Sequence, residues 1–430
     1  MLIRGTVVAD SATVVEDGAV VTRDDRIAAV GDAEELLDRY PDHERRTFDL
    51  VLPGLVNAHV HTVQSLGRGM ADDTSLLTWL FEHVLPMEAE MDAEATRVAA
   101  TLGYLELIES GVTSCVDHLS VNHAEEAFEA AGEVGIRGLL GKVLMDRDSP
   151  EGLLENTEEG LRESERLIRR YHGAFSDRIR YAVTPRFAVT CSEECLRGAR
   201  DLADEYGVRL HTHASENRSE VDRVATETGM RNVEWLDEVG LTGEDVLLAH
   251  CVHTDESERE ILAETGTNVV HCPSANMKLA SGVAPVEEYL GRGIPVALGN
   301  DGPPCNNTLD PFTEMREASL LAKSRSFDPT SLPARTVFEM ATETGARAAG
   351  FDDVGRLREG EKADVIGLGT ERARSTPIHD VHSHLVYAAR GDDVRFSMVD
   401  GRVLYEEDVH LTVDSEEIVE KARRIAQSFG

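Results

Sequence analysis

Lysine is almost absent from this chain, and basic charge is scarce overall. The 430 residues include 38 arginines but only Lys142, Lys278, Lys323, Lys362 and Lys421. Against them stand 80 acidic residues, so the formal net charge is −37. Such a surface repels phosphate backbones and anionic headgroups, which excludes nucleic acid and anionic membranes as partners. A salt-rich cytoplasm would screen the self-repulsion, which favours a halophilic source over a merely acidic mesophilic one.

Disulfide pairs, membrane spans and a secretion signal are also missing from the sequence. The six cysteines show no Cys-x-x-Cys spacing, which argues against a disulfide framework or a zinc knuckle. No apolar run approaches the roughly 18 residues that cross a bilayer. Residues 1–6 read as a strand rather than as the apolar core of a signal peptide. We therefore expect a cytoplasmic protein with no membrane partner.

Strand-like segments gather at both ends of the chain. Residues 6–9, 19–22 and 26–31 alternate as strands do, and so do residues 363–368, 394–399 and 402–405. Neither group is large enough to form a domain alone. We therefore expect the termini to meet in one small β-sandwich domain, built from residues 1–52 plus 352–430, with a helical tail over 415–429. Residues 53–351 would form the second domain, inserted between them.

The central part alternates short apolar strands with helical stretches, which is typical of a parallel α/β fold. No glycine-rich phosphate loop follows the first strand, which disfavours a dinucleotide-binding fold. Eight strand–helix units favour a closed (β/α)8 TIM barrel. The expected strands are Leu55–His59, Thr113–His118, Arg137–Val143, Arg180–Val183, Arg209–His213, Val246–His250, Asn268–His271 and Pro295–Gly299, and the expected helices include Ala93–Ser110, Ala124–Val134, Leu154–Tyr171 and Glu194–Tyr206.

Histidines and acids stand at the ends of these strands, where the active residues of such barrels lie. His59 and His61 are one residue apart on a strand, so their side chains point to the same face. His213 from the fifth strand and Asp301 after the eighth complete a set that suits Zn²⁺ or Fe²⁺, with one position open for water. The alternative is that these are strand-end polar residues in buried hydrogen bonds. That is the usual explanation for one such residue but not for so many in one barrel.

Glu216 follows His213 by three residues, in His213-Ala214-Ser215-Glu216. If the chain turns there, its carboxylate can reach over the metal beside that ligand. A proton carrier for the reacting water belongs at such a place. The alternative, a solvated loop glutamate, fits Glu220 better.

Six segments spread over nearly the whole chain match the motifs of one known family. They are Pro53–His61, His211–Glu216, Ala249–His253, His271–Gly282, Leu298–Gly302 and Gly360–Asp364. Together they resemble the amidohydrolase superfamily, in its branch of aromatic and purine deaminases and chlorohydrolases. The resemblance implies that the four residues of the metal set are ligands and that Asp301 is also a base. It further implies that His250 orients the attacking water, that Glu216 moves protons to the purine ring, and that the amino group leaves as ammonia.

Within this branch the chain is most similar to deaminases of 5′-deoxyadenosine, 5′-methylthioadenosine and S-adenosylhomocysteine. Residues 302–316 look most like the 5′-deoxyadenosine enzymes, and residues 77–88 match the segment that closes over substrate. The resemblance implies that Trp79 in this segment contacts substrate. It also implies that Glu88 accepts hydrogen bonds from the two ribose hydroxyls, a task that suits an acceptor-only carboxylate.

Three basic residues are further candidates for substrate contacts. Arg186 follows the fourth strand, where the methylthioadenosine/S-adenosylhomocysteine deaminases usually have histidine, although guanine deaminases and 5′-deoxyadenosine-like members share this Pro-Arg-Phe segment. Because no lysine ends that strand, the carboxylated lysine of two-metal relatives is not expected. Lys142 and Arg147 stand where a homocysteine carboxylate would bind, or else they are ordinary cations paired with Asp146 or Asp148.

The leading hypothesis is a metal-dependent hydrolytic deaminase that converts the 6-amino group of an adenosine-type nucleoside to the inosine form. It would use one divalent metal per subunit, Zn²⁺ ahead of Fe²⁺. The alternatives are a guanine deaminase or a pterin/triazine aminohydrolase or chlorohydrolase and, from another class, a catalytically idle barrel kept for binding or assembly. Retention of Glu216 and His250 beside the metal set disfavours the idle barrel. Enzymes of this kind often form homo-oligomers.

Overall fold

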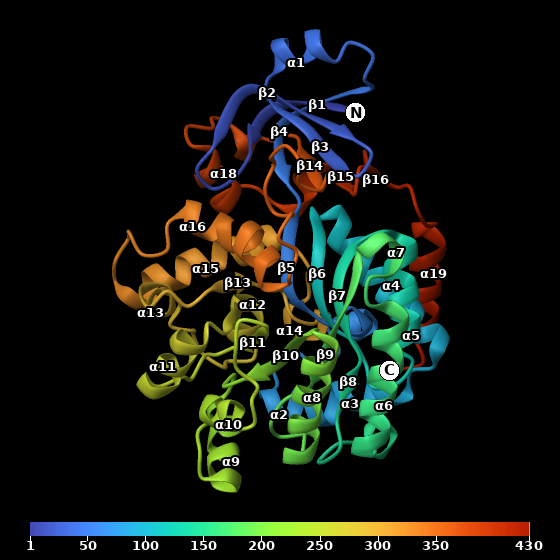
Figure 1. Ribbon diagram of the computed structural model, residues 1–430, viewed down its shortest axis with the longest axis vertical. Coiled ribbons are helices and arrows are strands. Elements are labelled where there is room, and N and C mark those ends of the chain that lie inside the picture. The colour runs from blue at the N-terminus through green and yellow to red at the C-terminus, as the bar shows by residue number, and fades with distance from the viewer. Residues whose placement is uncertain (430) are drawn as a thin grey trace.

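Two sheets organise the computed structural model, which describes residues 1–429. Figure 1 shows a small β-domain at one end of a barrel, with helices α2 (Leu76–Thr78), α3 (Leu85–Glu90) and α9 (Arg218–Thr228) at the opposite end. The N-terminal strands and the strands after residue 364 lie together in the small domain, as the sequence predicts. The division at residues 53 and 352 stays a prediction. Among residues 1–429, none of the helices is both long and apolar enough to cross a bilayer.

The larger sheet is a parallel barrel of eight strands, which confirms the predicted fold. Its hydrogen-bonded neighbours run in order from the first strand to the last, and a bridge between Val60 and Asp301 joins the two ends. There the Asp301 amide donates to the His59 carbonyl at 2.9 Å. The strands are β5 (Leu55–Val60), β6 (Val112–His118), β7 (Arg137–Gly141), β9 (Ile179–Pro185), β10 (Arg209–Ala214), β11 (Val246–His250), β12 (Asn268–His271) and β13 (Val296–Leu298).

The third predicted strand, expected as one run over Arg137–Val143, divides at Lys142. The two residues of β8 (Val143–Leu144) pair with β9 apart from the main path of the sheet. At the break, the Thr184 hydroxyl donates to the Lys142 carbonyl at 2.6 Å. A side-chain hydrogen bond thus satisfies a carbonyl that a continuous ladder would otherwise pair.

Helices cover the outside of the barrel, and their ends follow from polar caps and glycines. Asp92, Asn156 and Ser192 each accept a backbone N–H in the first turn of the helix that follows. Gly135 and Gly207 end helices with positive φ, a conformation that glycine adopts without steric cost. The covering helices include α4 (Ala93–Glu109), α5 (Ala124–Val134), α6 (Thr157–Tyr171), α8 (Glu193–Tyr206), α9 (Arg218–Thr228), α10 (Asn232–Glu238), α11 (Glu256–Thr265), α12 (Pro273–Lys278), α13 (Val286–Gly291) and α15 (Pro311–Ser326).

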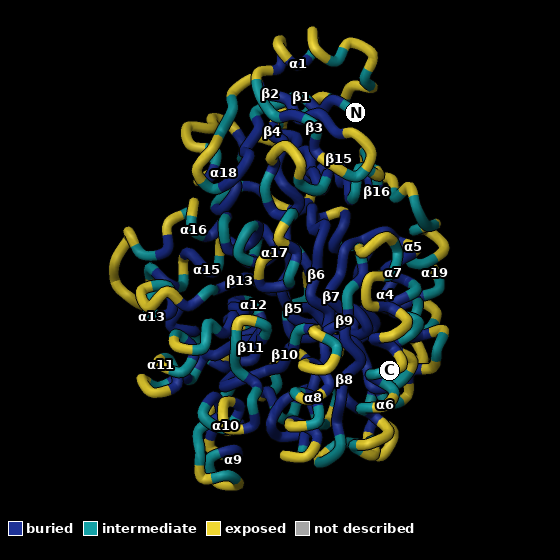
Figure 2. Tube along the Cα trace, viewed as in Figure 1, coloured by how far each residue is buried: buried dark blue, intermediate teal, exposed yellow. Residues whose placement is uncertain are grey.

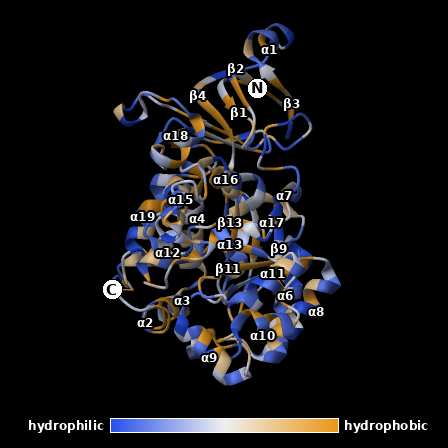
Figure 3. Ribbon diagram, turned by 90° about the vertical axis from the view of Figure 1, so that its left-hand side faces the viewer, coloured by the Kyte–Doolittle hydropathy of each residue, from blue (hydrophilic) through white to orange (hydrophobic). Residues whose placement is uncertain are grey.

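The barrel strands are buried on both faces, which explains why they read as apolar runs rather than as alternating ones. Figure 2 shows them as a buried centre with exposed segments confined to the helices and loops outside. The outer helices α6 and α8 are strongly amphipathic, and Figure 3 shows hydrophilic and hydrophobic stretches along α10. One large apolar cluster runs from the barrel strands through α5, α6 and α8 to the small domain.

The small domain is one continuous sheet in the order β17-β16-β15-β14-β4-β1-β2-β3. Its strands are β1 (Leu2–Val8), β2 (Val14–Arg23), β3 (Arg26–Asp32), β4 (Arg45–Pro53), β14 (Val365–Leu368), β15 (Val394–Val399), β16 (Arg402–Glu406) and β17 (Val409–His410). Apolar residues of both termini share one core between them, among them Ile3, Val51 and Phe396. The expected small domain from both termini is therefore confirmed.

Strand β4 is absent from the sequence-based expectation, yet it joins the two halves of the small sheet. It pairs with β1 on one side and with β14 on the other. Its first half alternates between exposed and half-buried residues, and its second half is fully buried. This change of pattern within nine residues hides the strand from a search for one period.

The C-terminal helix α19 (Ser415–Ala426) packs outside the barrel against α4, as expected for the helical tail. A buried ion cluster joins the two sheets: Arg137 on β7 donates to Asp364 at 2.8 and 3.0 Å and to Asp400 at 2.5 Å. The guanidinium is nearly inaccessible to solvent, with a side chain only 2% exposed. It therefore holds the small domain to the barrel through charge-assisted hydrogen bonds.

Candidate metal and catalytic site

Four histidines and an aspartate converge at the C-terminal ends of the barrel strands. His59 and His61 leave β5, His213 leaves β10, His250 ends β11, and Asp301 follows β13. All five are buried, and their nearest ligand atoms lie within 4.8 Å of one another in two overlapping groups. The predicted metal set of His59, His61, His213 and Asp301 is thus brought together in space.

Hydrogen bonds at Nδ1 set the tautomer of two of these rings, His61 and His213, and thereby leave Nε2 able to bind a metal. The Nδ1 of His61 lies 2.7 Å from the His118 carbonyl, and that of His213 lies 2.6 Å from the Arg186 carbonyl. A carbonyl only accepts, so each Nδ1 carries the hydrogen and each Nε2 keeps a lone pair. Burial holds the pKa of both rings well below the ordinary histidine value. Both rings are therefore neutral at physiological pH, the form that binds metals.

The inner face of the cluster fits a divalent cation. The Nε2 atoms of His61 and His213 are 3.1 Å apart, although two lone pairs at that distance repel unless a cation lies between them. His59 Nε2 is buried without a hydrogen-bond partner among residues 1–429, while its Nδ1 lies 3.0 Å from His211 Nε2. Asp301 Oδ1 is 3.5 Å from His59 Nε2 and 3.4 Å from His61 Nε2. Three imidazoles and a carboxylate match the donors of Zn²⁺ and Fe²⁺ sites.

The Asp301 carboxylate is held ionised by its surroundings. Burial by itself would raise its pKa, but the neighbouring rings, His59 first and then His250 and His61, lower the pKa well below the ordinary value. The Gly302 amide donates to Oδ1 at 2.7 Å. The backbone of Asp301 has φ of 65°, and that of His250 has φ of 75°. Such non-glycine conformations are costly, and they place side chains that regular strand geometry would direct elsewhere.

Glu216 faces this cluster from the turn after β10. Burial, together with the Asp301 carboxylate, raises its pKa well above the ordinary glutamate value. Its Oε2 lies 3.7 Å from His250 Nε2, and the Ser281 hydroxyl donates to its Oε1 at 3.4 Å. The Asn276 amide oxygen lies 2.9 Å from His250 Nδ1 and so directs His250 Nε2 toward the centre of the cluster. A carboxyl with a raised pKa and a directed imidazole therefore share one side of the site.

Glu220 is expected to be a solvated loop residue, but it is buried. It is 1% exposed, and its carboxylate accepts the backbone N–H of Glu216 at 2.8 Å and a hydrogen bond from Asn232. Burial raises its pKa to about 7. The capping of α9 explains the difference, because Glu220 turns back to the N-terminus of its own helix together with Asn217.

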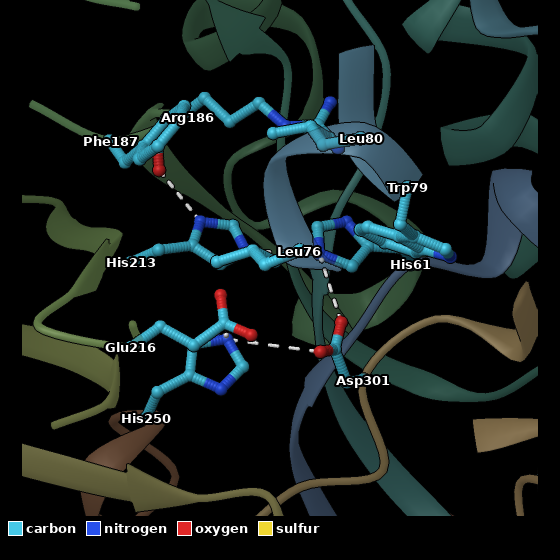
Figure 4. A pocket seen from close by; sticks show the side chains of 10 residues that line it. All are labelled: His61, Leu76, Trp79, Leu80, Arg186, Phe187, His213, Glu216, His250 and Asp301. Atoms are coloured by element: carbon cyan, nitrogen blue, oxygen red, sulfur yellow. Dashed lines mark hydrogen bonds and ion pairs between the residues drawn. The ribbon is translucent and has the colours of Figure 1, made fainter. Parts of the chain in front are cut away.

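A cavity opens above the cluster. Figure 4 shows Glu216, His250 and Asp301 on one side of it and Arg186 and Leu80 on the opposite side. The apolar wall comes largely from the rim segments α2 (Leu76–Thr78) and η2 (Trp79–Val84), the latter a π-helix of the kind frequent at functional sites. The lining residues are His61, Leu76, Trp79, Leu80, Arg186, Phe187, His213, Glu216, His250 and Asp301.

Two of the candidate substrate contacts, Trp79 and Arg186, line this cavity. Within the described part of the chain, the Trp79 indole N–H has no hydrogen-bond acceptor, which leaves it for a ligand. Glu88 lies directly behind Arg186, where it accepts from the guanidinium at 3.0 and 3.4 Å. The Gln64 amide donates to the same carboxylate at 2.7 Å. Glu88 is 2% exposed and reaches the cavity wall through these partners.

The structure places the other two basic candidates away from the cavity lining. The Lys142 ammonium is bound by both oxygens of Glu155 at 2.7 and 2.6 Å. Arg147 pairs with Glu227 at 3.0 Å and donates to the Ala188 carbonyl at 2.6 Å. Neither pairs with the aspartates that the sequence suggests, because the segment before α6 and helix α9 bring Glu155 and Glu227 closer.

Several side chains around the candidate site are not predicted from the sequence. Leu76, Leu80 and Phe187 form the apolar wall, and Asn276 and Gln64 position His250 and Glu88. Apolar residues of this kind occur throughout the core, so residue type does not identify them. The available signal is that they lie close in sequence to Trp79 and Arg186. The two amides act on partners 26 and 24 residues away, a relation that follows from the fold alone.

Comparison with known proteins gives one family over most of the chain. A model of the amidohydrolase family matches residues 50–404, and a model of the imidazolonepropionase-like composite domain of bacteria matches residues 18–42. A 5′-deoxyadenosine deaminase of Methanothermobacter thermautotrophicus is 42% identical over 99% of this chain and 98% of its own. A 5-methylthioadenosine/S-adenosylhomocysteine deaminase of Haloarcula marismortui is 42% identical over 88% of this chain and 87% of its own.

Solved structures give the same fold. An adenosine deaminase of Xanthomonas campestris with bound zinc superposes with a TM-score of 0.93 at 31% identity, covering 100% of this chain and 98% of its own. A guanine deaminase of E. coli superposes with a TM-score of 0.87 at 28% identity, covering 94% of this chain and 99% of its own.

Proposed function

This chain belongs to the amidohydrolase family, as the sequence motifs predict, and we propose that it is a hydrolytic deaminase of adenosine-type nucleosides. The reaction exchanges the 6-amino group of the purine for oxygen and releases ammonia. The observation that carries the proposal is the buried Glu216, with its raised pKa, beside a cluster of three histidines and an aspartate. Relatives that are 42% identical to this chain and named deaminases of 5′-deoxyadenosine or 5-methylthioadenosine/S-adenosylhomocysteine support the nucleoside class.

The metal of this site is proposed to be one Zn²⁺ per subunit, with Fe²⁺ as the alternative. His59, His61, His213 and Asp301 would hold it, because their inner atoms converge and none of them is exposed. The bound ion supplies Lewis acidity that brings the ionisation of water into the neutral range. The zinc in the adenosine deaminase from Xanthomonas campestris supports this choice. Metal analysis of protein purified without added metal tests it.

Three side chains share the proton transfers of this proposal. Glu216, whose pKa burial raises, donates a proton to the ring nitrogen beside the reacting carbon, which makes that carbon more electrophilic. His250 accepts a hydrogen bond from the attacking water at Nε2, because its Nδ1–H is held by Asn276. Asp301 is ionised and takes the proton of that water. Asp301 passes this proton to the amino group, the C–N bond breaks and ammonia leaves, and Glu216 recovers a proton from the new hydroxyl as the carbonyl forms.

Recognition of the nucleoside is proposed to use the opposite side of the cavity. Glu88, held between Gln64 and Arg186, accepts the ribose hydroxyls, and the Trp79 indole N–H donates to the ligand. Arg186 holds Glu88 and contributes its guanidinium edge to the wall. Lys142 and Arg147, whose cations are already paired, are left out of substrate binding.

The test is ammonia release by the purified, metal-loaded enzyme. The panel contains 5′-deoxyadenosine, 5′-methylthioadenosine, S-adenosylhomocysteine, adenosine and guanine. We expect turnover of the adenosine compounds, with a shift of the absorption spectrum from the adenine to the hypoxanthine form. Turnover of guanine alone would refute the nucleoside assignment.

Two broader expectations remain part of this proposal. The enzyme is expected in the cytoplasm, which cell fractionation tests, and as a homo-oligomer, which light scattering coupled to size-exclusion chromatography tests. A nucleoside is its expected small-molecule partner.

A further inference from the structure

Among residues 1–429, the lining of the cavity offers no free positive charge to the far end of a nucleoside. Of the ten residues that line it, Arg186 alone carries a permanent cation, and Glu88 binds that cation through two hydrogen bonds. Glu88 in turn is held by Gln64, and both members of the ion pair are buried. A substrate carboxylate that approached Arg186 would have to displace Glu88. The Glu88 carboxylate would then be buried without a partner, which is costly.

Lys142 is directed to the outside of the barrel. Its ammonium donates to Glu155 and to the Val143 carbonyl. The other groups that act on it, Glu163 on α6 and Cys195 on α8, belong to covering helices and not to the cavity. It therefore serves the packing of helices on strands and cannot meet a ligand inside.

Two more arginines, Arg147 and Arg223, lie outside the cavity lining, and both are neutralised locally. Arg147 binds Glu227 on α9 and the carbonyl of Ala188, the residue after the lining Phe187. Arg223 on α9 binds Glu227 at 2.9 Å and Asp148 at 2.7 Å. These four charged side chains, Arg147, Asp148, Arg223 and Glu227, form the rim network. The network is uncharged overall and ties the loop after β8 to α9.

The remaining wall is apolar or acidic. Leu76, Trp79, Leu80 and Phe187 provide apolar surface, and the acids of the lining are Glu216 and Asp301. An apolar wall of this kind binds a methyl or methylthio group by excluding water from it. A charged amino-acid chain loses its hydration there and finds its counter-charges already occupied.

From these contacts we infer that the enzyme selects adenosine derivatives with a small uncharged 5′ substituent and discriminates against an amino-acid extension. The inference rests on the proposed deaminase function and names its substrate class. 5′-Deoxyadenosine and 5′-methylthioadenosine fit this class, whereas S-adenosylhomocysteine, with its carboxylate and ammonium groups, does not. The rim network is the positioning element that withholds Arg147 from such a carboxylate.

The first experiment compares kcat/KM for these three nucleosides with the metal-loaded enzyme. We expect 5′-deoxyadenosine and 5′-methylthioadenosine within about tenfold of each other and S-adenosylhomocysteine lower by about 100-fold or more, as for a ligand whose polar groups find no partner. Equal kcat/KM for all three, or a preference for S-adenosylhomocysteine, would overturn the inference. If all three adenosine compounds are inert, the proposed deaminase function itself fails, which is a distinguishable outcome.

The second experiment removes the acidic partner of Arg147 in the rim network. Glu227→Gln removes the partner of Arg147 without touching the cavity lining, and Glu417→Gln on α19 removes an equal charge from an exposed helix ion pair far from the rim. We expect Glu227→Gln to raise kcat/KM for S-adenosylhomocysteine relative to 5′-deoxyadenosine by about fivefold, chiefly through KM. The control should leave that ratio unchanged. An equal ratio in both variants would overturn the role of the rim network.

Discussion

Replacement of Glu216 by glutamine should separate the chemistry of this site from its stability. The amide keeps the size of the side chain and its place beside Ser281, but it cannot deliver the proton that the buried carboxyl holds. General acid–base catalysis contributes about 10²–10⁴-fold in rate, which corresponds to about 3–5.5 kcal/mol of activation free energy. We therefore expect kcat to fall by that factor while the metal content stays unchanged, because Glu216 is not among the ligands.

Whereas its kcat falls, the free energy of unfolding of the Glu216→Gln variant should rise. The pKa of Glu216 is raised in the folded protein, so the unfolded chain loses this proton first, near its ordinary pKa of 4.5. Between the unfolded and the folded pKa the unfolded state binds fewer protons, and the free energy of unfolding falls as pH rises. Glutamine has no such proton, so the variant should be more stable than the parent at pH 7 to 8, and the difference should vanish below the unfolded pKa.

The assay combines ammonia release with urea unfolding at several pH values. Glu260→Gln, at an exposed position of α11, is the matched control and should change neither property. A Glu216→Gln variant that keeps kcat within tenfold of the parent would refute the role of Glu216 as proton donor. A variant less stable than the parent at pH 8 would refute the proposed burial of an unfavourable charge.

Three further outcomes test other parts of the structure. His211→Ala removes the partner of His59 Nδ1 and should weaken metal affinity by about 10–100-fold, measured by competition with a chelator, while a variant that holds metal as tightly as the parent contradicts this role. Arg137→Ala leaves two carboxylates buried between the sheets and should lower the free energy of unfolding by about 3–5 kcal/mol in urea titrations, whereas Arg162→Ala, at an exposed site, should stay within about 0.5 kcal/mol. With a net charge of −37, the urea midpoint should rise as KCl increases from about 0.1 to about 2 M, and a flat response would argue against the halophilic interpretation.

Much of the barrel follows from local pattern. Strands buried on both faces appear in the sequence as short apolar runs. Polar caps and glycines indicate where the helices between them begin and end. For this reason the predicted element bounds agree closely with those of the structure. Strand β4 is the exception, because one half faces solvent on alternate residues and the other half is enclosed by β1 and β14. Its burial depends on strands more than 300 residues apart, which no local window contains.

The catalytic constellation divides in the same way. His59, His61, His213, His250 and Asp301 stand out in the sequence because strand ends in such a barrel must converge on one face, so residue type and position are enough to predict their meeting. The sequence by itself thus determined the family, the barrel and the set of groups able to hold a metal.

Only the tertiary structure decided what surrounds that set. Burial that raises the pKa of Glu216, the pairing of Arg186 with Glu88, and the outward turn of Lys142 depend on side chains from separate elements. Each is an electrostatic property, and electrostatic energies depend on distance and solvent access rather than on residue type. The chemistry could therefore be anticipated from the chain alone, whereas the charge balance of the cavity, and with it the inferred choice of substrate, required the fold.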